Sequence, residues 1–379
     1  MKRKISITTG TRAEYGILRP VLHAIDSSKK LELCLIVTGM HLSKKYGLTI
    51  NEIRKDGFKI AAIVNMKSKD DSAYEITRTL GKTITSFSEV FKNIKPDLNV
   101  ILGDRDEMLA SAITAYHMNI PNAHIHGGDK SGGIDEYTRH AITKTSNIHF
   151  VATQKSKERV IKMGENPKFV YLVGSPSIDE VIRNKITSKV ELEKKYDMKI
   201  HGDEILLLQH PVTTQIQLSK KQILNTLKAI TQVKKQTIVI APNSDAGSKQ
   251  IYEQITKFSK KYSYIKMYPT VPRSDYLSML KHFGVLVGNS SSGIIEASYF
   301  GTPVVNIGIR QKNREKSKNV IDVPQKSKLI YLAITKALAT KNRYNSRSIY
   351  GSGVAATKIV KLLEQVKISN RLLQKELTY

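Results

Sequence analysis

Short apolar runs alternate with amphipathic segments along nearly the whole chain. The runs are rich in Val, Ile and Leu, whereas segments such as residues 17–26 and 106–118 carry apolar residues at helical spacing. Apolar strands that alternate with helices are typical of parallel sheets covered on both faces, so the sequence predicts an α/β fold. The predicted strands are residues 4–10, 31–39, 59–66, 97–104, 122–128, 148–153, 168–175, 204–212, 236–245, 264–269, 284–291, 302–308 and 319–324.

The strand pattern is interrupted over residues 176–203, where the sequence is polar and helical. A second series of strands follows this connector. We therefore predict two Rossmann-like domains in tandem, residues 1–175 and 176–353, and one long helix over residues 354–379 that packs back on the first domain. A chain of 379 residues with 40% apolar content is large enough for two hydrophobic cores.

The formal net charge is +28, with 61 Lys and Arg against 33 Asp and Glu. Nucleic-acid binding is one interpretation of this charge. However, the lysines are spread along the predicted helices, and the aromatic-and-basic strand pattern of RNA-binding sheets is missing. We therefore expect a solvated, Lys-rich surface and no nucleic-acid partner. A basic protein also attracts anionic substrates.

Apolar runs in the sequence are too short to span a membrane, which takes about 18 residues. The basic N-terminus is followed by an apolar segment that predicts a first strand and not a signal peptide. Cys34 is the only cysteine, which excludes an intramolecular disulfide. We expect a cytoplasmic protein without a membrane partner.

Distinctive polar stretches follow many of the predicted strands. Ligands of parallel sheets bind at the carboxyl ends of strands, so we expect these stretches to line a single cleft between the two domains. They are TTGTRAEYG (residues 8–16), LGDRDE (102–107), HIHGGDKSGGIDEYTRH (124–140), LQHPVTT (208–214), APNSDAGSK (241–249) and GNSSSG (288–293).

Several of these residues could bind phosphate. Arg12, Arg105 and Arg310 are candidate cations, and residues 288–293 could present backbone N–H groups and hydroxyls to an anion at a helix N-terminus. The same serines could equally cap a helix without any ligand. Neither a dinucleotide-binding glycine motif after the first strand nor a P-loop occurs, which disfavours nicotinamide dehydrogenases and P-loop NTPases.

The first domain carries carboxylates at the same edge, namely Asp104, Glu107, Asp129, Asp135 and Glu136. Each could cap a helix or complement its dipole. Several carboxylates beside phosphate-binding cations are also what C–H deprotonation or glycosidic cleavage requires. Both interpretations remain open for each residue.

His124 and His126 lie on one face of a predicted strand, with Asp129 nearby. A metal site is one possibility, but a third ligand at a clear spacing is missing. We expect one histidine to pack in the core, the other to form hydrogen bonds, and no metal to bind. A serine hydrolase is disfavoured because the G-x-S-x-G motif does not occur.

Taken in order, the six polar stretches, the last extended to residue 315, resemble the hydrolysing UDP-N-acetylglucosamine 2-epimerases of sialic acid biosynthesis over essentially the whole chain. The resemblance implies two Rossmann-like domains of glycosyltransferase-B type, an active-site cleft between them, a UDP-sugar substrate, no cofactor, and a homodimer. It implies UDP contacts from Arg12, Arg105, His210, Asn243, Ser290, Ser291, Glu296 and Arg310.

The resemblance also implies that Asp104 and Asp135 are catalytic acid–base groups. The chain departs from the family at His126, where many relatives have a glutamate, and at Asp129, which relatives often replace with glutamate. Either His126 or Asp129 is then the third member of the acid–base set.

The activity implied is anti-elimination of UDP from UDP-N-acetylglucosamine to 2-acetamidoglucal, followed by hydration to N-acetylmannosamine. Alternatives are a hydrolysing 2-epimerase of UDP-N,N'-diacetylbacillosamine or of a GDP-sugar on the legionaminic acid route, and a non-hydrolysing UDP-N-acetylglucosamine 2-epimerase. A glycosyltransferase of the same fold and a basic nucleic-acid-binding protein are more distant alternatives.

Overall fold

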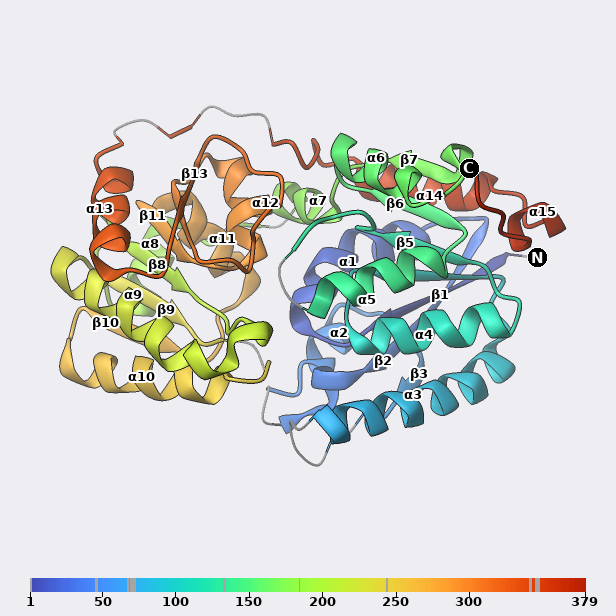
Figure 1. Ribbon diagram of the computed structural model, residues 1–379, viewed down its shortest axis with the longest axis horizontal. Coiled ribbons are helices and arrows are strands. Elements are labelled where there is room, and N and C mark those ends of the chain that lie inside the picture. Colours follow the sequence, from blue (N-terminus) through green and yellow to red (C-terminus); the bar gives the residue numbers. More distant parts are fainter. Residues whose placement is uncertain are drawn as a thin grey trace. The chain divides into compact units, whose positions relative to one another are not determined.

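The structure is a computed structural model that describes residues 2–44, 47–66, 68, 73–131, 134–183, 185–242, 245–340, 343–344 and 348–379. The chain divides into two compact units (Figure 1). The first comprises Met1–Asp129, Asp135–Glu180 and Tyr350–Tyr379, and the second comprises Lys130–Ile134 and Val181–Ile349.

The first unit is built on a parallel sheet of seven strands, counted over the described residues. In chain order these are β1 (Arg3–Thr9), β2 (Leu31–Thr38), β3 (Ile60–Val64), β4 (Leu98–Leu102), β5 (Asn122–Ile125), β6 (Ile148–Val151) and β7 (Val170–Leu172). Their order across the sheet is β3-β2-β1-β4-β5-β6-β7. The central strands are buried on both faces, which explains their continuous apolar sequences.

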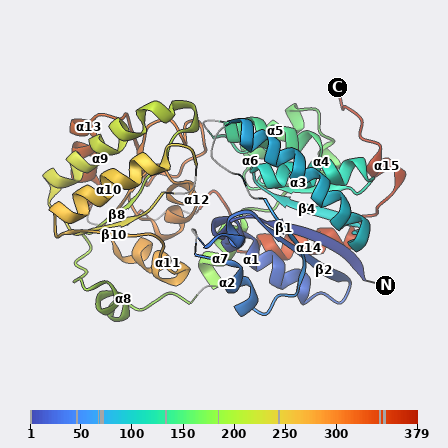
Figure 2. The ribbon, with the colours of Figure 1, turned by 90° about the horizontal axis from the view of Figure 1, so that it is seen from below.

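Helices cover both faces of this sheet. They are α1 (Arg12–Asp26), η1 (Gly39–Leu42), α2 (Ile50–Lys55), α3 (Ala73–Ile94), α4 (Asp106–His117), α5 (Ile134–Lys144), α6 (Gln154–Lys162), η3 (Pro167–Phe169), α7 (Pro176–Arg183), α14 (Ala355–Gln365) and α15 (Asn370–Leu373). One face packs against α1, α2 and α14, and the other against α3, α4 and α5 (Figure 2). Each face thus has its own apolar core.

The second unit repeats this plan with six strands among the described residues. The strands are β8 (Ile205–Leu208), β9 (Thr237–Ile240), β10 (Ile265–Tyr268), β11 (Val285–Gly288), β12 (Val304–Ile307) and β13 (Val320–Val323). The helices are α8 (Lys189–Tyr196), η4 (Thr213–Leu218), α9 (Ser219–Val233), α10 (Ser248–Lys261), α11 (Arg273–His282), α12 (Ser291–Phe300) and α13 (Ser327–Leu338). The strand order is β10-β9-β8-β11-β12-β13, with α9, α10 and α13 on one face and α8, α11 and α12 on the other.

These observations confirm the predicted fold class of two parallel α/β domains. Each of the predicted strands contains or overlaps an observed strand, and each recorded strand pair of the described residues is parallel. In the described part of the chain, no helix has the length and apolar character needed to cross a bilayer.

The prediction of one long helix over residues 354–379 is wrong, because this segment forms α14 and the short α15. The backbone is extended at Val366, and the side-chain amide of Asn147 donates to the backbone oxygen of Leu372 at 2.7 Å. Beyond α14 the backbone therefore leaves the helix and forms a hydrogen bond with a residue distant in the sequence. The start of α14 is fixed by Asp179, whose carboxylate accepts from two backbone N–H groups of the first turn at 3.0 and 2.9 Å.

We predict that Leu363→Ala lowers the free energy of unfolding by about 2–5 kcal/mol, because the Leu363 side chain of α14 is fully buried in the core of the first unit. Chemical denaturation followed by circular dichroism measures this change. Lys361→Ala on the exposed face of the same helix is the control and should change the free energy by less than about 0.5 kcal/mol. Equal effects of the two substitutions would contradict the packing of α14.

Candidate active site

The loop after β1 is fixed by a capping box at the start of α1. Thr11 Oγ1 accepts a hydrogen bond from the backbone N–H of Glu14 at 3.2 Å. Glu14 Oε2 accepts from the N–H groups of Gly10 and Thr11, both at 3.0 Å. Arg12 follows directly and forms an ion pair with Glu52 of α2 at 3.0 Å. The loop thus presents Arg12 at the carboxyl end of β1.

Asp104 follows β4 and forms an ion pair with Arg139 of α5. The Arg139 side chain is 3% exposed and also donates to the backbone oxygen of Asp129 at 2.9 Å. A buried guanidinium therefore balances the charge of Asp104 and ties α5 to the ends of β4 and β5. Asp135 lies four residues before Arg139, on the same face of α5.

The two histidines have different surroundings. His124 is fully buried in β5, where its Nδ1 contacts Thr143 Oγ1 at 3.1 Å and its Nε2 contacts the backbone oxygen of Gly103 at 2.7 Å. Burial lowers the pKa of His124 to about 3, so it is a neutral structural link between β4 and α5.

His126 lies just beyond β5 in the left-handed region, with φ at 68°, and is also buried. Its Nδ1 is 3.9 Å from Asp129 Oδ2. Asp129 is held on its other oxygen by Ser156 Oγ at 2.8 Å. Positive φ at a non-glycine residue is costly and is concentrated at functional sites. Among the described residues, no group of three or more His, Cys, Asp or Glu side chains could hold a metal ion.

Arg105 is the second cation of the first unit's strand edge. Its Nε donates to Glu107 Oε1 at 3.1 Å, and its side chain is partly exposed. Glu107 is in the first turn of α4 and is 3% exposed. The buried Glu107 carboxylate therefore orients the guanidinium of Arg105.

In the second unit, Asn289 joins the loops that follow β8 and β11. Its Oδ1 accepts from the backbone N–H of His210 at 2.7 Å, and its Nδ2 donates to the backbone oxygen of His210 at 2.8 Å. Gly288 allows the two loops to approach, since its φ is +136° and a Cβ there would lie 2.0 Å from the backbone oxygen of Leu208. Arg310, after β12, donates to the backbone oxygen of Asn289 at 3.2 Å.

Ser290 is the N-cap of α12, and Ser291 is the first residue of the helix. The Ser290 side chain accepts from the backbone N–H of Ser292 at 3.3 Å. The cap satisfies one N–H group of the first turn, and the helix dipole places partial positive charge at the same point. His210, Ser290, Ser291 and Arg310 thus lie at neighbouring strand ends of one sheet.

Glu296 lies in α12 and is 4% exposed. Arg273, the first residue of α11, donates to both of its carboxylate oxygens at 2.9 and 2.6 Å, and Ser292 Oγ donates at 2.6 Å. Tyr276 contacts Ser292 Oγ and lies under the Arg273 guanidinium. This cluster fixes Glu296 rigidly within the second unit.

The structure reveals three site neighbours that the sequence analysis missed: Arg139, Glu14 and Arg273. The spacing of Asp135 and Arg139 by four residues was an available signal for Arg139, because such a pair shares a helix face. The T-x-x-E pattern at Thr11 was the signal for Glu14. Asn243, a predicted nucleotide contact, lies outside the described residues.

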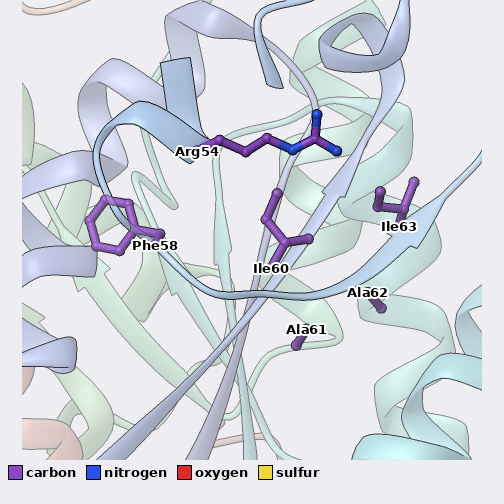
Figure 3. A pocket seen from close by; sticks show the side chains of 6 residues that line it. All are labelled: Arg54, Phe58, Ile60, Ala61, Ala62 and Ile63. Atoms are coloured by element: carbon purple, nitrogen blue, oxygen red, sulfur yellow. The ribbon is translucent and has the colours of Figure 1, made fainter. Parts of the chain in front are cut away.

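Figure 3 shows a hollow lined by residues of α2, of the edge strand β3 and of the segment between them. The side chains that line it are apolar except for that of Arg54. The lining residues are Arg54, Phe58, Ile60, Ala61, Ala62 and Ile63.

We predict that Gly288→Ala destabilises the second unit, because the added Cβ collides with backbone and cannot be relieved by a side-chain rotation. Thermal unfolding should begin at a lower temperature than in the wild type. Gly81→Ala is the matched control: Gly81 lies inside α3 with open space around it, so alanine there should stabilise by about 0.5–1 kcal/mol. A Gly288→Ala protein as stable as the wild type would contradict the close approach of the two loops.

Comparisons with known proteins agree on one family. The family model described as UDP-N-acetylglucosamine 2-epimerase matches residues 23–364. The chain is 38% identical over 375 residues to the Legionella pneumophila UDP-N,N'-diacetylbacillosamine 2-epimerase (hydrolyzing), covering 99% of both chains. It is 34% identical over 367 residues to the Neisseria meningitidis UDP-N-acetylglucosamine 2-epimerase, covering 97% of this chain and 95% of that one.

The fold also matches solved structures. The Methanocaldococcus jannaschii UDP-GlcNAc 2-epimerase, in complex with UDP-GlcNAc and UDP, superposes with a TM-score of 0.81 over 95% of this chain and 99% of that one, at 21% identity. The fold is therefore that of the glycosyltransferase-B type, as the sequence analysis expected.

Proposed function

Because the chain belongs to the UDP-N-acetylglucosamine 2-epimerase family, we propose that it is a hydrolysing 2-epimerase of a UDP-linked 2-acetamido sugar. The observation that carries this proposal is the 38% identity, over 99% of both chains, to a relative whose name specifies hydrolysing 2-epimerisation. That relative makes UDP-N,N'-diacetylbacillosamine the first candidate substrate. UDP-N-acetylglucosamine is the second candidate, supported by the family description and by the Neisseria relative.

The second unit binds the UDP in this proposal. The diphosphate lies at the N-terminus of α12, where Ser290, Ser291 and the backbone N–H groups donate to its oxygens. Arg310 and His210 contact the nucleotide from the adjacent strand ends. Glu296 accepts from the ribose, because Arg273 and Ser292 donate three hydrogen bonds to a carboxylate that offers about four acceptor sites.

Asn243 adds a further nucleotide contact in the proposal. From the first unit, Arg12 and Arg105 supply positive charge to the same UDP group. Both guanidiniums are ion-paired within that unit and partly exposed, so each is already oriented when the substrate arrives. Positive charge here favours departure of the UDP anion.

The carbon chemistry belongs to the carboxylates of the first unit. The C2–H of the sugar becomes acidic as the C1–O bond to UDP breaks and positive charge builds on the ring. Asp104 accepts the C2 proton, and the C1–O electron pair leaves with UDP to give the glycal. Asp104 is suited to this role because Arg139 stabilises its carboxylate form.

Hydration completes the reaction. Water adds its oxygen to C1 of the glycal, and C2 receives a proton on the face opposite to the one that lost it. Two faces of one carbon require two acid–base groups, so we assign the second transfer to Asp135. His126 or Asp129 assists, since the two lie 3.9 Å apart at the end of β5.

Incubation with each candidate sugar nucleotide, UDP-linked and GDP-linked, followed by NMR tests the proposal. We expect a free 2-epimerised sugar and UDP, with one deuterium at C2 when the solvent is D2O. A nucleotide-linked product would indicate the non-hydrolysing reaction. A product without deuterium at C2, or turnover that depends on a sugar acceptor, would reject the elimination mechanism.

Asp104→Asn should lower kcat by about 10²–10⁴-fold, because the amide cannot accept the C2 proton, while UDP binding measured by calorimetry persists. Asp26→Asn is the control, since Asp26 is exposed at the far end of α1 and should leave kcat unchanged. Near wild-type turnover in Asp104→Asn would show that another group is the base.

A further inference from the structure

Two buried carboxylates lie beside Gly10, the first residue after β1. Glu14 Oε2 accepts from the backbone N–H of Gly10, whereas Glu14 Oε1 is buried and has no hydrogen-bond partner. Glu107 of α4 reaches the same glycine from the other side. A Cβ on Gly10 would lie 2.0 Å from Glu107 Oε1, so the carboxylate occupies the space that any side chain there would need.

The charges around this pair do not balance if both carboxylates are ionised. The cation recorded at the pair is Arg105, which donates to Glu107 Oε1 at 3.1 Å. Asp104 adds negative charge and is matched by Arg139 of α5. Glu14 therefore has no cation of its own among the recorded contacts of the described residues.

His41 does not supply the missing charge. It packs at the end of β2, where its ring contacts Thr9 at 3.1 Å and Thr49 at 2.7 Å. Burial lowers the pKa of His41 to about 4, which keeps the imidazole neutral at physiological pH. Among the recorded contacts of the described residues, the pair thus has one positive neighbour, Arg105, for two carboxyl groups.

We propose that Glu14 and Glu107 share one proton, held on Glu14 Oε1 and donated to the Glu107 carboxylate, and that neutral Glu14 is a positioning residue for Arg105. A carboxylic acid paired with a carboxylate carries a single negative charge, which matches the single charge of the guanidinium. The proton also satisfies the buried oxygen that otherwise has no partner. The link between this positioning role of Glu14 and turnover rests on the function proposed above.

The electrostatics agree with this geometry. Burial first, and then the charge of Glu107, raise the pKa of Glu14 to about 8, against the lowering effect of Arg105 and of the Gly10 N–H group. This raised pKa keeps the Glu14 carboxyl group protonated at neutral pH.

A raised carboxyl pKa predicts a defined pH dependence. Between the unfolded value near 4.5 and the folded value near 8, the native protein binds one proton more than the unfolded chain. The stability contribution of Glu14 is therefore complete below about pH 4.5 and declines as the pH rises towards 8. Above pH 8 the pair carries two negative charges and holds Arg105 more tightly, away from the substrate.

Glu14→Gln tests the shared proton. Its amide oxygen can still accept from the two loop N–H groups, and its NH₂ group can donate to Glu107 as the acid does. Difference infrared spectroscopy at pH 7 should show a protonated-carboxyl band in the wild type that is missing in the variant. The unfolding free energy of the variant should also decline less between pH 5 and pH 8. An unchanged band in Glu14→Gln would overturn the proposal.

Glu107→Gln keeps the test decisive if the first variant fails to fold. Removing the negative neighbour should lower the pH at which the Glu14 band disappears, whereas an unchanged midpoint would overturn the coupling. Glu89→Gln, exposed on α3, is the control that should leave the band and its midpoint unaltered.

The kinetic readout separates positioning from folding. Relative to its own rate at pH 7, Glu14→Gln should retain up to about tenfold more kcat/KM at pH 9 than the wild type, since a group with a pKa near 8 is mostly ionised at pH 9. If kcat/KM declined equally between pH 7 and pH 9 in the variant and the wild type, the positioning of Arg105 by Glu14 would be rejected. Failure of every sugar nucleotide to turn over would reject the proposed function alone, because the infrared and stability results do not depend on a substrate.

Discussion

Parallel strand pairing is the constraint on which the candidate site residues of each unit depend. It places the carboxyl ends of neighbouring strands at one edge, so loops far apart in the sequence converge there. Tight backbone packing at that edge then fixes the loops. Gly288 lets the loop after β11 meet the end of β8, and Gly10 leaves room for the Glu107 carboxylate. A side chain at either glycine would force these neighbouring groups apart.

Charge balance is the second organising feature, and it differs between the units. In the first unit, the three carboxylates of Asp104, Glu107 and Glu14 lie near two guanidiniums. Arg139 pairs with Asp104, and Arg105 pairs with Glu107. In the second, Arg273 neutralises Glu296 within a rigid cluster, and the N-terminus of α12 carries the partial positive charge of the helix dipole. In the proposed reaction, the first unit supplies the acid–base groups and the second unit binds the UDP anion.

The resemblance drawn from six short motifs is confirmed, because the family model matches residues 23–364 and the Legionella relative aligns over 99% of the chain. The relatives narrow the candidate sugars to two, because their names include both N,N'-diacetylbacillosamine and N-acetylglucosamine. The roles of Asp104, Asp135, His126 and Asp129 remain predictions, as do the nucleotide contacts.

The sequence by itself determined the strands, the two parallel sheets and the helix start at Ser290, because periodicity and capping depend on residues close together in the chain. It did not determine the end of α14, where the backbone becomes extended at Val366 and the segment beyond it binds Asn147 through Leu372. Nor could it show that Arg139 neutralises Asp104 or that Glu14 meets Glu107. Such pairs are 35 and 93 residues apart, and their ionisation depends on burial and on the charges that only the folded chain brings within reach.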